Sequence, residues 1–438
     1  MSLVVAKFGG SSLADANQFR KVAKIVKENP DRKYIVPSAP GKRFDDDIKI
    51  TDLLYKAYEL SSEGEDFSPV LKQITDRYDG IIADLGLDMD LTAEYEKIKV
   101  SLESNAGRDY AASRGEYLSG MILAKLLGYH FMDAAKCIRF NETGSFNSEF
   151  TFEKTKEHLS HYDRAVVPGF YGRMPNGTIK TFSRGGSDIT GSLVARAVGA
   201  DLYENWTDVD GFLVTDPRII KNAKIINKIT YKELRELSYM GATVLHEDAI
   251  FPVHQAGIPI NIRNTNNPSA PGTMIVLDTK VDENTPNITG IAGKKGFSIV
   301  NIEKAMMNAE IGFGKKVLSV LEREELCFEH LPSGIDTMSV VIDSKALEPK
   351  KEDLLYTIRR ETLADSISFD DNLALIAVVG VGMRKTTGTA ARVLTAIAKQ
   401  NINIRMLDQG SSELNIIIGV DEEHFEEALK AIYNEFFE

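Results

Sequence analysis

The sequence of 438 residues contains only two cysteines, Cys137 and Cys327, which form no Cys-x-x-Cys motif. This scarcity excludes a disulfide framework and is typical of proteins in a reducing compartment. We expect both thiols to lie in a hydrophobic core. The chain also lacks an apolar run of about 18 residues, the length that a membrane-spanning helix needs, and its start lacks a basic segment followed by an apolar one. The sequence therefore predicts a cytoplasmic protein with no membrane partner.

Positive charge is also in deficit, with 52 lysines and arginines against 64 acidic residues and a net charge of -12. Because nucleic acids and anionic lipids are bound by basic surfaces, this balance argues against both as partners. If the substrates are anions, cations such as Lys7, Arg184 and Arg218 must act locally. The length predicts two or more domains, and 43% apolar with 26% charged residues is an ordinary globular composition.

The segment Lys-Phe-Gly-Gly-Ser-Ser, residues 7–12, stands between an apolar run at 3–6 and an amphipathic helix that we expect from about residue 14. Two glycines leave the backbone amides open to an anion, and a helix start adds unpaired N–H groups. Lys7 would supply a positive charge. The spacing fits neither a Walker A loop nor a dinucleotide loop. On this motif alone, a phosphate site and a tight turn after an edge strand are equally open.

The next segments predict a β-α-β unit. Apolar residues at helical spacing from Phe19 to Val26 are ended by Asn-Pro-Asp at 29–31, and a strand follows at 34–36. Three aspartates at 45–47 then precede a helix that opens near Lys49. An acidic run of this kind can bind a metal, but a solvated loop is the favoured interpretation.

A helix is predicted from Asp109 to Leu127, ending at Gly128, with Arg-Gly-Glu at 114–116 inside it. Gly115 costs a helix about 1 kcal/mol relative to alanine, so either a close neighbour or ligand, or tight helix packing, must explain it. We expect Glu116 near the edge of the buried stripe, where its carboxylate can face a cleft.

A second glycine-rich motif, Ser-Arg-Gly-Gly-Ser-Asp at 183–188, follows a strand at 165–170 and a hairpin at 175–177. We expect Ser187 and Asp188 to cap the next helix, and Arg184 can grip a carboxylate through two hydrogen bonds. The alternative is a capped helix with an incidental surface arginine. A strand from Leu202 then ends in small and acidic residues, which is where open α/β sheets place ligands.

The C-terminal part repeats one pattern of strand, helix, strand, strand and helix. We expect the last strand of the first domain at 258–262 and a boundary within the polar stretch 278–287. The second copy lacks its fourth strand, which is either borrowed from 288–292 or supplied by a shared sheet. The predicted elements are 298–302, 310–322, 326–331, 337–342 and 350–360, then 374–379, 387–399, 403–407, 413–420 and 422–436.

Taken together, these motifs resemble the aspartate kinase family. They stand in family order along the whole chain and include Trp-Thr-Asp-Val-Asp-Gly at 206–211, Thr-Asp-Pro-Arg at 215–218 and Gly-Ala-Thr-Val-Leu-His at 241–246. The resemblance implies an α/β amino-acid kinase fold, an open, mostly parallel sheet with helices on both faces, followed by two α+β ACT repeats. The implied domains are a catalytic domain at 1–282 and ACT domains at 288–370 and 371–438.

The resemblance also implies phosphorylation of the side-chain carboxylate of L-aspartate by ATP with Mg²⁺, the first step towards lysine, threonine and methionine. Lys7 and Asp188 would be the catalytic residues. Thr243 stands where the family usually carries a nucleotide-contacting lysine, and Leu213 where a tyrosine near the adenine is common. The implied ATP contacts are Lys7, Gly9, Gly10, Ser11, Thr207, Asp208, Arg218 and Thr243. The implied aspartate contacts are Ser38, Thr51, Glu116, Arg184, Ser187 and Asp188.

This chemistry agrees with elementary acid-base behaviour. An aspartate side chain has a reference pKa near 3.9, so the nucleophile is already ionised and needs no general base. Asp188 is therefore assigned to orientation of the substrate amine or of a lysine. Alternatives are a kinase of the same fold for glutamate or acetylglutamate, which the paired C-terminal repeats oppose, and a non-catalytic amino-acid sensor. The altered Thr243 motivates the sensor, and the retained Lys7 opposes it.

The resemblance further implies feedback control through the ACT repeats and a homodimer or homotetramer joined by them. L-lysine is the implied effector. The helix start at Gly312 and Phe313 can receive the effector's carboxylate, and Glu329 falls where lysine-sensitive members carry an acidic residue. The alternative for Glu329 is an ordinary solvated glutamate.

Overall fold

The computed structural model describes residues 2–183, 185–241, 247–277 and 285–438. Arg184 and Thr243 thus lie outside the described residues. The chain forms two compact units. The first contains residues 1–212, 225–231 and 244–278, and the second contains residues 213–224, 232–243 and 279–438.

The first unit is built on a mostly parallel sheet, as expected. Within the described residues the sheet has eight strands in the order β3-β4-β2-β1-β7-β9-β10-β8, and only β9 and β10 pair antiparallel. The prediction that the strand at 258–262 is the last one of this domain is wrong, because β10 follows β9 in the same sheet. The strands are β1 Val4–Phe8, β2 Arg32–Pro37, β3 His130–Phe131, β4 Ala165–Val166, β7 Leu202–Thr207, β8 Lys228–Thr230, β9 Ile260–Asn264 and β10 Thr273–Val276.

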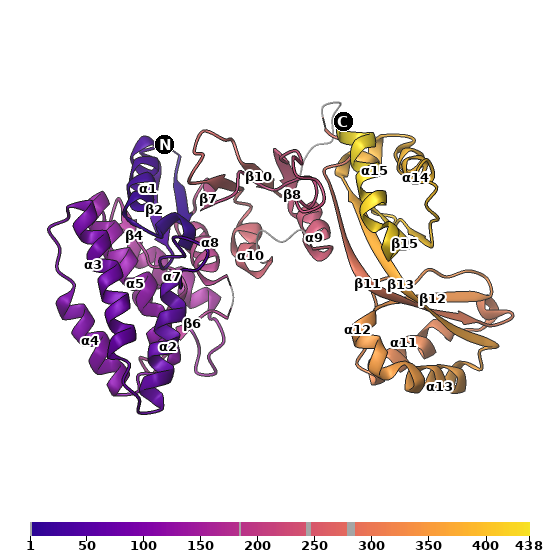
Figure 1. Cartoon of the computed structure of the whole chain (residues 1–438), viewed down its shortest axis with the longest axis horizontal. Helices are drawn as coiled ribbons and strands as arrows, with labels where there is room; N and C mark the ends of the chain where they lie inside the picture. Colours follow the sequence, from indigo (N-terminus) through magenta and orange to yellow (C-terminus); the bar gives the residue numbers. More distant parts are fainter. Residues whose placement is uncertain (1, 184, 242–246, 278–284) are drawn as a thin grey trace. The chain divides into compact units, whose positions relative to one another are not determined.

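Helices cover both faces of this sheet (Figure 1). Alternation along β1 turns Phe8 into a core shared with α1 to α5, whereas Lys7 points to the opposite face, towards α8. The predicted hairpin forms from β5 Tyr171–Arg173 and β6 Ile179–Thr181. The helices are α1 Ala16–Glu28, α2 Ile50–Ser62, α3 Ser68–Leu85, α4 Thr92–Glu103, α5 Arg108–Leu127, α6 Ala134–Cys137, α7 Ser148–Leu159, α8 Gly186–Val198 and α10 Glu247–Ala256.

Local signals set the helix ends. Helix α5 ends at Gly128, which adopts a left-handed φ of 71° that glycine accepts without strain. Helix α1 begins only at Ala16, because the Asp15 carboxylate accepts a hydrogen bond from the N–H of Gln18 and a short 3-10 turn, η1 Gly10–Leu13, comes first. The described residues include no helix with the length and apolar character that crossing a membrane requires.

The second unit contains an antiparallel sheet whose five described strands have the order β12-β11-β13-β15-β14. Its strands are β11 Gly290–Glu303, β12 Thr337–Asp343, β13 Ser366–Val379, β14 Met406–Asp408 and β15 Asn415–Asp421. Its helices are α9 Tyr231–Tyr239, α11 Phe313–Arg323, α12 Ser344–Leu347, α13 Lys351–Thr362, α14 Thr389–Ala398 and α15 Phe425–Phe437, with short 3-10 turns η2 Met307–Ala309, η3 Glu348–Lys350, η4 Val381–Lys385 and η5 Glu422–His424.

The two repeats share this sheet through β11 and β13. Residues 290–294 of β11 pair with 375–379 of β13, and residues 299–303 of β11 pair with 366–370. Each repeat therefore completes its sheet with half of a strand that continues into the other. The two alternatives for the missing strand prove to be one arrangement, since 288–292 lead into the shared β11.

A buried carboxylate from α9 joins this unit. Glu233, with 1% of its surface exposed, accepts hydrogen bonds from the Thr289 hydroxyl at 2.6 Å and from the N–H of Val381 at 2.8 Å. Helix α9 lies in a part of the chain that precedes both repeats, so the second unit is not one continuous stretch of sequence.

The strand expected at 326–331 is wrong. Glu325 turns the chain after α11 with a φ of +52°, and the following residues are irregular apart from an isolated bridge between His330 and Val341. Cys327 lies in this segment and is exposed, so the expectation that both cysteines are core thiols holds only for Cys137.

Candidate functional site

The ammonium group of Lys7 lies where β1, β7 and α8 meet. It is 2.6 Å from Asp188 Oδ1 and donates to Asn205 Oδ1 at 3.3 Å, while Asn205 Nδ2 donates to the same Asp188 oxygen at 2.8 Å. Lys7 and Asn205 are direct neighbours in the parallel pairing of β1 with β7. The sequence motifs named Lys7 and Asp188 but missed Asn205, whose one signal was a polar residue inside a buried strand.

Close approach requires the second glycine after β1, Gly10, whereas a Cβ at Gly9 would make only ordinary contacts, 3.5 Å from the Trp206 carbonyl oxygen. A Cβ at Gly10 would lie 3.0 Å from the Ala39 carbonyl oxygen, and the carbonyl of Gly10 accepts a hydrogen bond from the N–H of Gly41 at 2.8 Å. Gly9 donates to the Trp206 carbonyl at 2.9 Å, and Ser11 is half-buried. The loop leads into the short turn η1 rather than into the N-terminus of α1, and α1 starts at Ala16, two residues later than expected.

The start of α8 differs from the expected capping arrangement. Its N-cap is Gly185, with a φ of +57° and no side-chain capping hydrogen bond, and Ser187 and Asp188 lie within the first turn. The expectation that they cap the helix is wrong because the Asp188 carboxylate pairs with the Lys7 ammonium instead. A Cβ at Gly169 would lie 2.5 Å from Ser187 Oγ, so the chain after β4 packs directly on this turn.

Glu116 is a buried carboxyl with one unpaired oxygen. It is 5% exposed, and Oε2 has no hydrogen-bond partner among the described residues. Burial raises the pKa of Glu116 to about 8, although the backbone N–H of Ala39 and the charge of Arg114 act in the opposite direction. The expected place at the edge of a stripe is wrong, because α5 is buried on nearly every side.

The surroundings of Gly115, next to Glu116, explain why a glycine stands inside this helix. A Cβ there would lie 2.7 Å from the Ala39 Cβ and 3.4 Å from side-chain carbons of Ile50 and Leu54. Tight packing against the segment after β2 thus explains the glycine, and it brings Glu116 beside Ala39.

The remaining predicted acceptor contacts lie on the same segment. The N–H of Ser38, at the end of β2, donates to the Phe8 carbonyl at 3.0 Å, and Thr51 lies in the first turn of α2. Both side chains are half-buried. The carboxyl ends of β1 and β2 thus converge with the starts of α2 and α8, at the edge where open α/β sheets bind ligands.

The acidic run at 45–47 is only partly solvated. Asp45 and Asp46 are exposed, but the Asp47 side chain is 9% exposed and receives hydrogen bonds from Arg43 and Arg77. Burial alone would raise the pKa of the Asp47 carboxyl, yet the hydrogen bonds from the backbone and side chain of Arg43 lower it below the ordinary value. The solvated interpretation is therefore wrong for Asp47.

Two of the predicted nucleotide contacts lie at the end of β7. Thr207 is half-buried and donates to the exposed Asp208 carboxylate at 3.2 Å, and the Thr207 carbonyl accepts from the N–H of Thr265 at 2.9 Å. Arg218 belongs to the second unit, where its exposed guanidinium binds Asp216.

The described residues contain no group of three or more acidic, histidine or cysteine side chains that could hold a metal ion.

The predicted effector residues lie in the second unit. Gly312 caps α11 with a φ of +84°. The Phe313 side chain is buried, and its N–H donates to the Glu310 carbonyl at 3.3 Å. The N–H of Glu329 donates to the Val341 carbonyl at 2.8 Å. The burial of Tyr239 and its hydrogen bond with the Glu329 carboxylate raise the pKa of Tyr239 to about 12.

Comparison with known families gives two matches. The description "Amino acid kinase family" matches residues 2–264, and "ACT domain" matches residues 376–436. Aspartokinase 3 of Bacillus subtilis is 39% identical over 99% of this chain and 98% of its own length. Chloroplastic aspartokinase 1 of Arabidopsis thaliana is 29% identical over 99% of this chain and 80% of its own length.

Solved structures agree along the full chain. Aspartate kinase from Clostridium acetobutylicum, described as an allosteric enzyme, is 54% identical and superposes with a TM-score of 0.89 over 100% of both chains. Aspartokinase III of E. coli is 26% identical with a TM-score of 0.71 over 100% of both chains. It has been solved with aspartate and ADP in an R-state and with lysine and aspartate in a T-state.

Proposed function

The chain belongs to the aspartokinase family, with an amino acid kinase domain and a C-terminal ACT domain, and we propose that the cluster around Lys7 is where it transfers phosphate from ATP to the side-chain carboxylate of L-aspartate. The observation that carries this proposal is the convergence of Lys7, Asp188 and Asn205 beside two glycines at the end of β1.

Lys7 supplies the positive charge that the reaction needs. The acceptor carboxylate and the phosphates are both anions, so catalysis depends on positioning and charge neutralisation rather than on proton removal. Asp188 and Asn205 hold the Lys7 ammonium, and the loop of Gly9, Gly10 and Ser11 receives the transferred phosphate. Gly10 and Ser11 offer it their backbone N–H groups, while the N–H of Gly9 donates to the Trp206 carbonyl. Mg²⁺ bound to ATP would supply further positive charge at the phosphates.

The acceptor side of the site is assigned to L-aspartate. Arg184 receives a carboxylate, and Glu116 with Asp188 faces the ammonium group. Ser38 and Thr51 approach the reacting end of the aspartate, and Ser187 provides a further polar contact to it. The unpaired oxygen of the buried Glu116 supports this assignment, because a buried acceptor without a partner is costly unless a ligand donates to it.

The nucleotide side is assigned to Thr207, Asp208, Arg218 and Thr243. A neutral Thr243 loses the charge that the family lysine supplies. Lys180 is a poor substitute, because its ammonium already binds Asp109 at 2.8 Å.

The release of ADP with three acceptors tests the proposed function. L-Aspartate should support turnover, whereas L-glutamate and N-acetylglutamate should not. Turnover with one of the latter two would assign the chain to another substrate, and no turnover with any of them would favour a sensor.

For regulation we propose L-lysine as the effector. The E. coli relative binds lysine in its T-state, and Glu329, close to Tyr239, offers a carboxylate for a second ammonium group. A factor of 100 in affinity between two states would give a bias of about 2.7 kcal/mol. L-Lysine should inhibit the wild type, and Glu329→Gln should weaken this inhibition while leaving kcat without lysine nearly intact. Inhibition by threonine alone would refute the assignment.

Assembly into a homodimer or homotetramer through the ACT repeats completes the proposal. Strands β12 and β14 form the edges of the described sheet, and edge strands are ready sites for pairing. Light scattering with and without L-lysine measures the assembly directly, and a monomer under both conditions would refute it.

A further inference from the structure

The segment at 38–51 connects both sides of the proposed site. It begins with Ser38 and ends with Thr51, and between them the N–H of Gly41 donates to the Gly10 carbonyl at 2.8 Å. A Cβ at Gly41 would lie 2.7 Å from the carbonyl carbon of Gly10. Any shift of this segment therefore moves acceptor contacts and the phosphate loop together.

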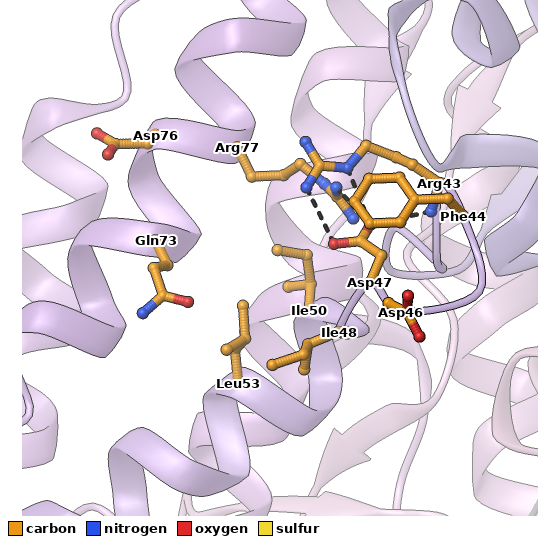
Figure 2. A pocket seen from close by; sticks show the side chains of 10 residues that line it. All are labelled: Arg43, Phe44, Asp46, Asp47, Ile48, Ile50, Leu53, Gln73, Asp76 and Arg77. Carbon is orange, nitrogen blue, oxygen red and sulfur yellow. Dashed lines mark hydrogen bonds and ion pairs between the residues drawn. The ribbon is translucent and has the colours of Figure 1, made fainter.

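One arginine on α3 holds this segment. Arg77, which is 8% exposed, donates from Nη2 to the Gly41 carbonyl at 2.9 Å and from Nη1 to Asp47 Oδ2 at 2.9 Å. Arg43 donates to the same carboxylate from its N–H, Nε and Nη2, each at 2.9 Å. Figure 2 shows both guanidinium groups at the Asp47 carboxylate. The segment is thus closed on itself by Arg43 and attached to α3 by Arg77.

The surroundings give this attachment its importance. An open hollow of about 400 Å³ flanks the segment, with Phe44, Ile48 and Gln73 among its lining residues. This side of the segment borders a hollow and is not fully packed against other side chains. The two hydrogen bonds of Arg77 therefore hold the segment in place there. The next residue on α3, Tyr78, donates to the Gly115 carbonyl at 2.7 Å, beside Glu116.

We propose that Arg77 is a positioning residue for phosphoryl transfer, which fixes the segment at 38–51 and, through Gly41, the turn at Gly10. The inference rests on the proposed function of the cluster around Lys7. The planar fork of arginine reaches the Asp47 carboxylate and the Gly41 carbonyl from two separate nitrogens, whereas a lysine presents one compact charge on a single nitrogen.

The test compares Arg77→Lys with Arg32→Lys. Arg32 is a matched control, since it is 6% exposed and also bridges a carboxylate, that of Glu204 at 2.6 and 3.0 Å, and a carbonyl, that of Ile25 at 2.5 Å. Arg77→Lys should lower kcat/KM for aspartate by ~10-fold or more, because small displacements of reacting groups have large effects on rate. Arg32→Lys should stay within about twofold despite a similar loss of thermal stability.

Hydrogen exchange without substrates gives a second readout. Amides at 38–51 should exchange faster in Arg77→Lys than in the wild type, and should be unchanged in Arg32→Lys. This result is independent of the acceptor, so a wild type that phosphorylates another acid would refute the proposed function and leave the role of Arg77 under test. If Arg77→Lys does not fold, Asp47→Asn, which keeps the volume and removes the charge, should show both effects more weakly.

Either of two results would overturn the proposal. One is an Arg77→Lys variant, or its Asp47→Asn substitute, with kcat/KM within about twofold of the wild type at a temperature where it is folded. The other is unchanged exchange at 38–51.

Discussion

Lys7 is almost completely buried, and the proposed reaction needs its positive charge beside the phosphates. Its removal would leave Asp188 and the phosphates as neighbouring anions without a cation between them. Lys7→Ala should therefore lower kcat by ~100-fold or more with a smaller change in KM for aspartate, the usual scale for a preorganised charge. Steady-state kinetics provides the measurement.

Lys33 supplies the control, since it lies on the neighbouring strand β2 and forms an ion pair of the same length, 2.6 Å, with Asp163. Lys33→Ala should leave kcat near that of the wild type. Near-normal turnover in Lys7→Ala would remove Lys7 from the mechanism.

The raised pKa of Glu116 gives a pH prediction. At pH 7 a carboxyl with a pKa of about 8 is mostly protonated, yet an ammonium ligand needs the carboxylate. The kcat/KM for aspartate, which reports groups of the free enzyme, should rise with pH up to about 8 and then level off. In Glu116→Gln this rise should disappear and kcat/KM should be low throughout. A wild-type profile that is flat between pH 6 and about 9 would contradict the assignment.

The stability that Glu116 contributes should fall as pH rises, whereas kcat/KM should rise. Between its ordinary pKa of 4.5 and about 8, Glu116 holds a proton in the folded state that the unfolded state has lost. Its contribution to the free energy of unfolding therefore falls as pH rises through this window. The Tm of Glu116→Gln minus the Tm of the wild type should therefore be more positive at pH 8 than at pH 5. Thermal melts at both pH values check this, and an equal difference at both would contradict it.

At the scale of elements, two helical glycines make a contrasting pair. A Cβ added at Gly80 on α3 would have no neighbour within 4 Å, whereas a Cβ at Gly115 on α5 would lie 2.7 Å from the Ala39 Cβ. Gly80→Ala should stabilise the protein by up to about 1 kcal/mol. Gly115→Ala should destabilise it by about 1–3 kcal/mol through overpacking, and should lower activity by moving Glu116. Chemical denaturation measures both, and equal effects would show that α5 adapts.

The contrast also shows what sequence can reveal about elements. The end of α5 was predictable, because Gly128 acts on its own helix. The burial of Glu116 was not, since residues from α2 and from the segment after β2 surround α5. Asp47 illustrates the same limit: an acidic run looks solvated until Arg77, 30 residues away, is placed beside it.

At the scale of the second unit, the shared strands predict mutual dependence of the two repeats. A chain that ends at Asp370 would lose residues 375–379, the partners of 290–294 in β11. The first repeat should then fail to fold by itself, because half of its longest strand has no neighbour. Limited proteolysis should cleave residues 290–370 rapidly in the shortened chain and slowly in the full one. Equal resistance would show that the first repeat is independent.

The sequence predicted most elements of the chain in their order, but it missed β10, placed a strand at 326–331 that does not form, and did not predict the division into two units. The repeated spacing indicated two similar repeats. Because the second repeat lacked its fourth strand, the sequence also offered a shared sheet as one alternative. The chain passes between the two compact units after Phe212, Lys224 and Tyr231, among other points. Such crossings depend on contacts between distant residues and have no local signal.

Glu233 has a consequence for genetic recombination. A crossover near residue 282 would pass the two repeats to a new kinase sequence and leave behind the carboxylate that binds Thr289 and Val381. The inherited regulatory part would then carry a buried hydroxyl and a buried N–H matched to a residue of another lineage. Chimeras should therefore tolerate a junction at 282 only when the recipient supplies a glutamate at the position of Glu233, which makes this one helix a compatibility marker between kinase and regulator.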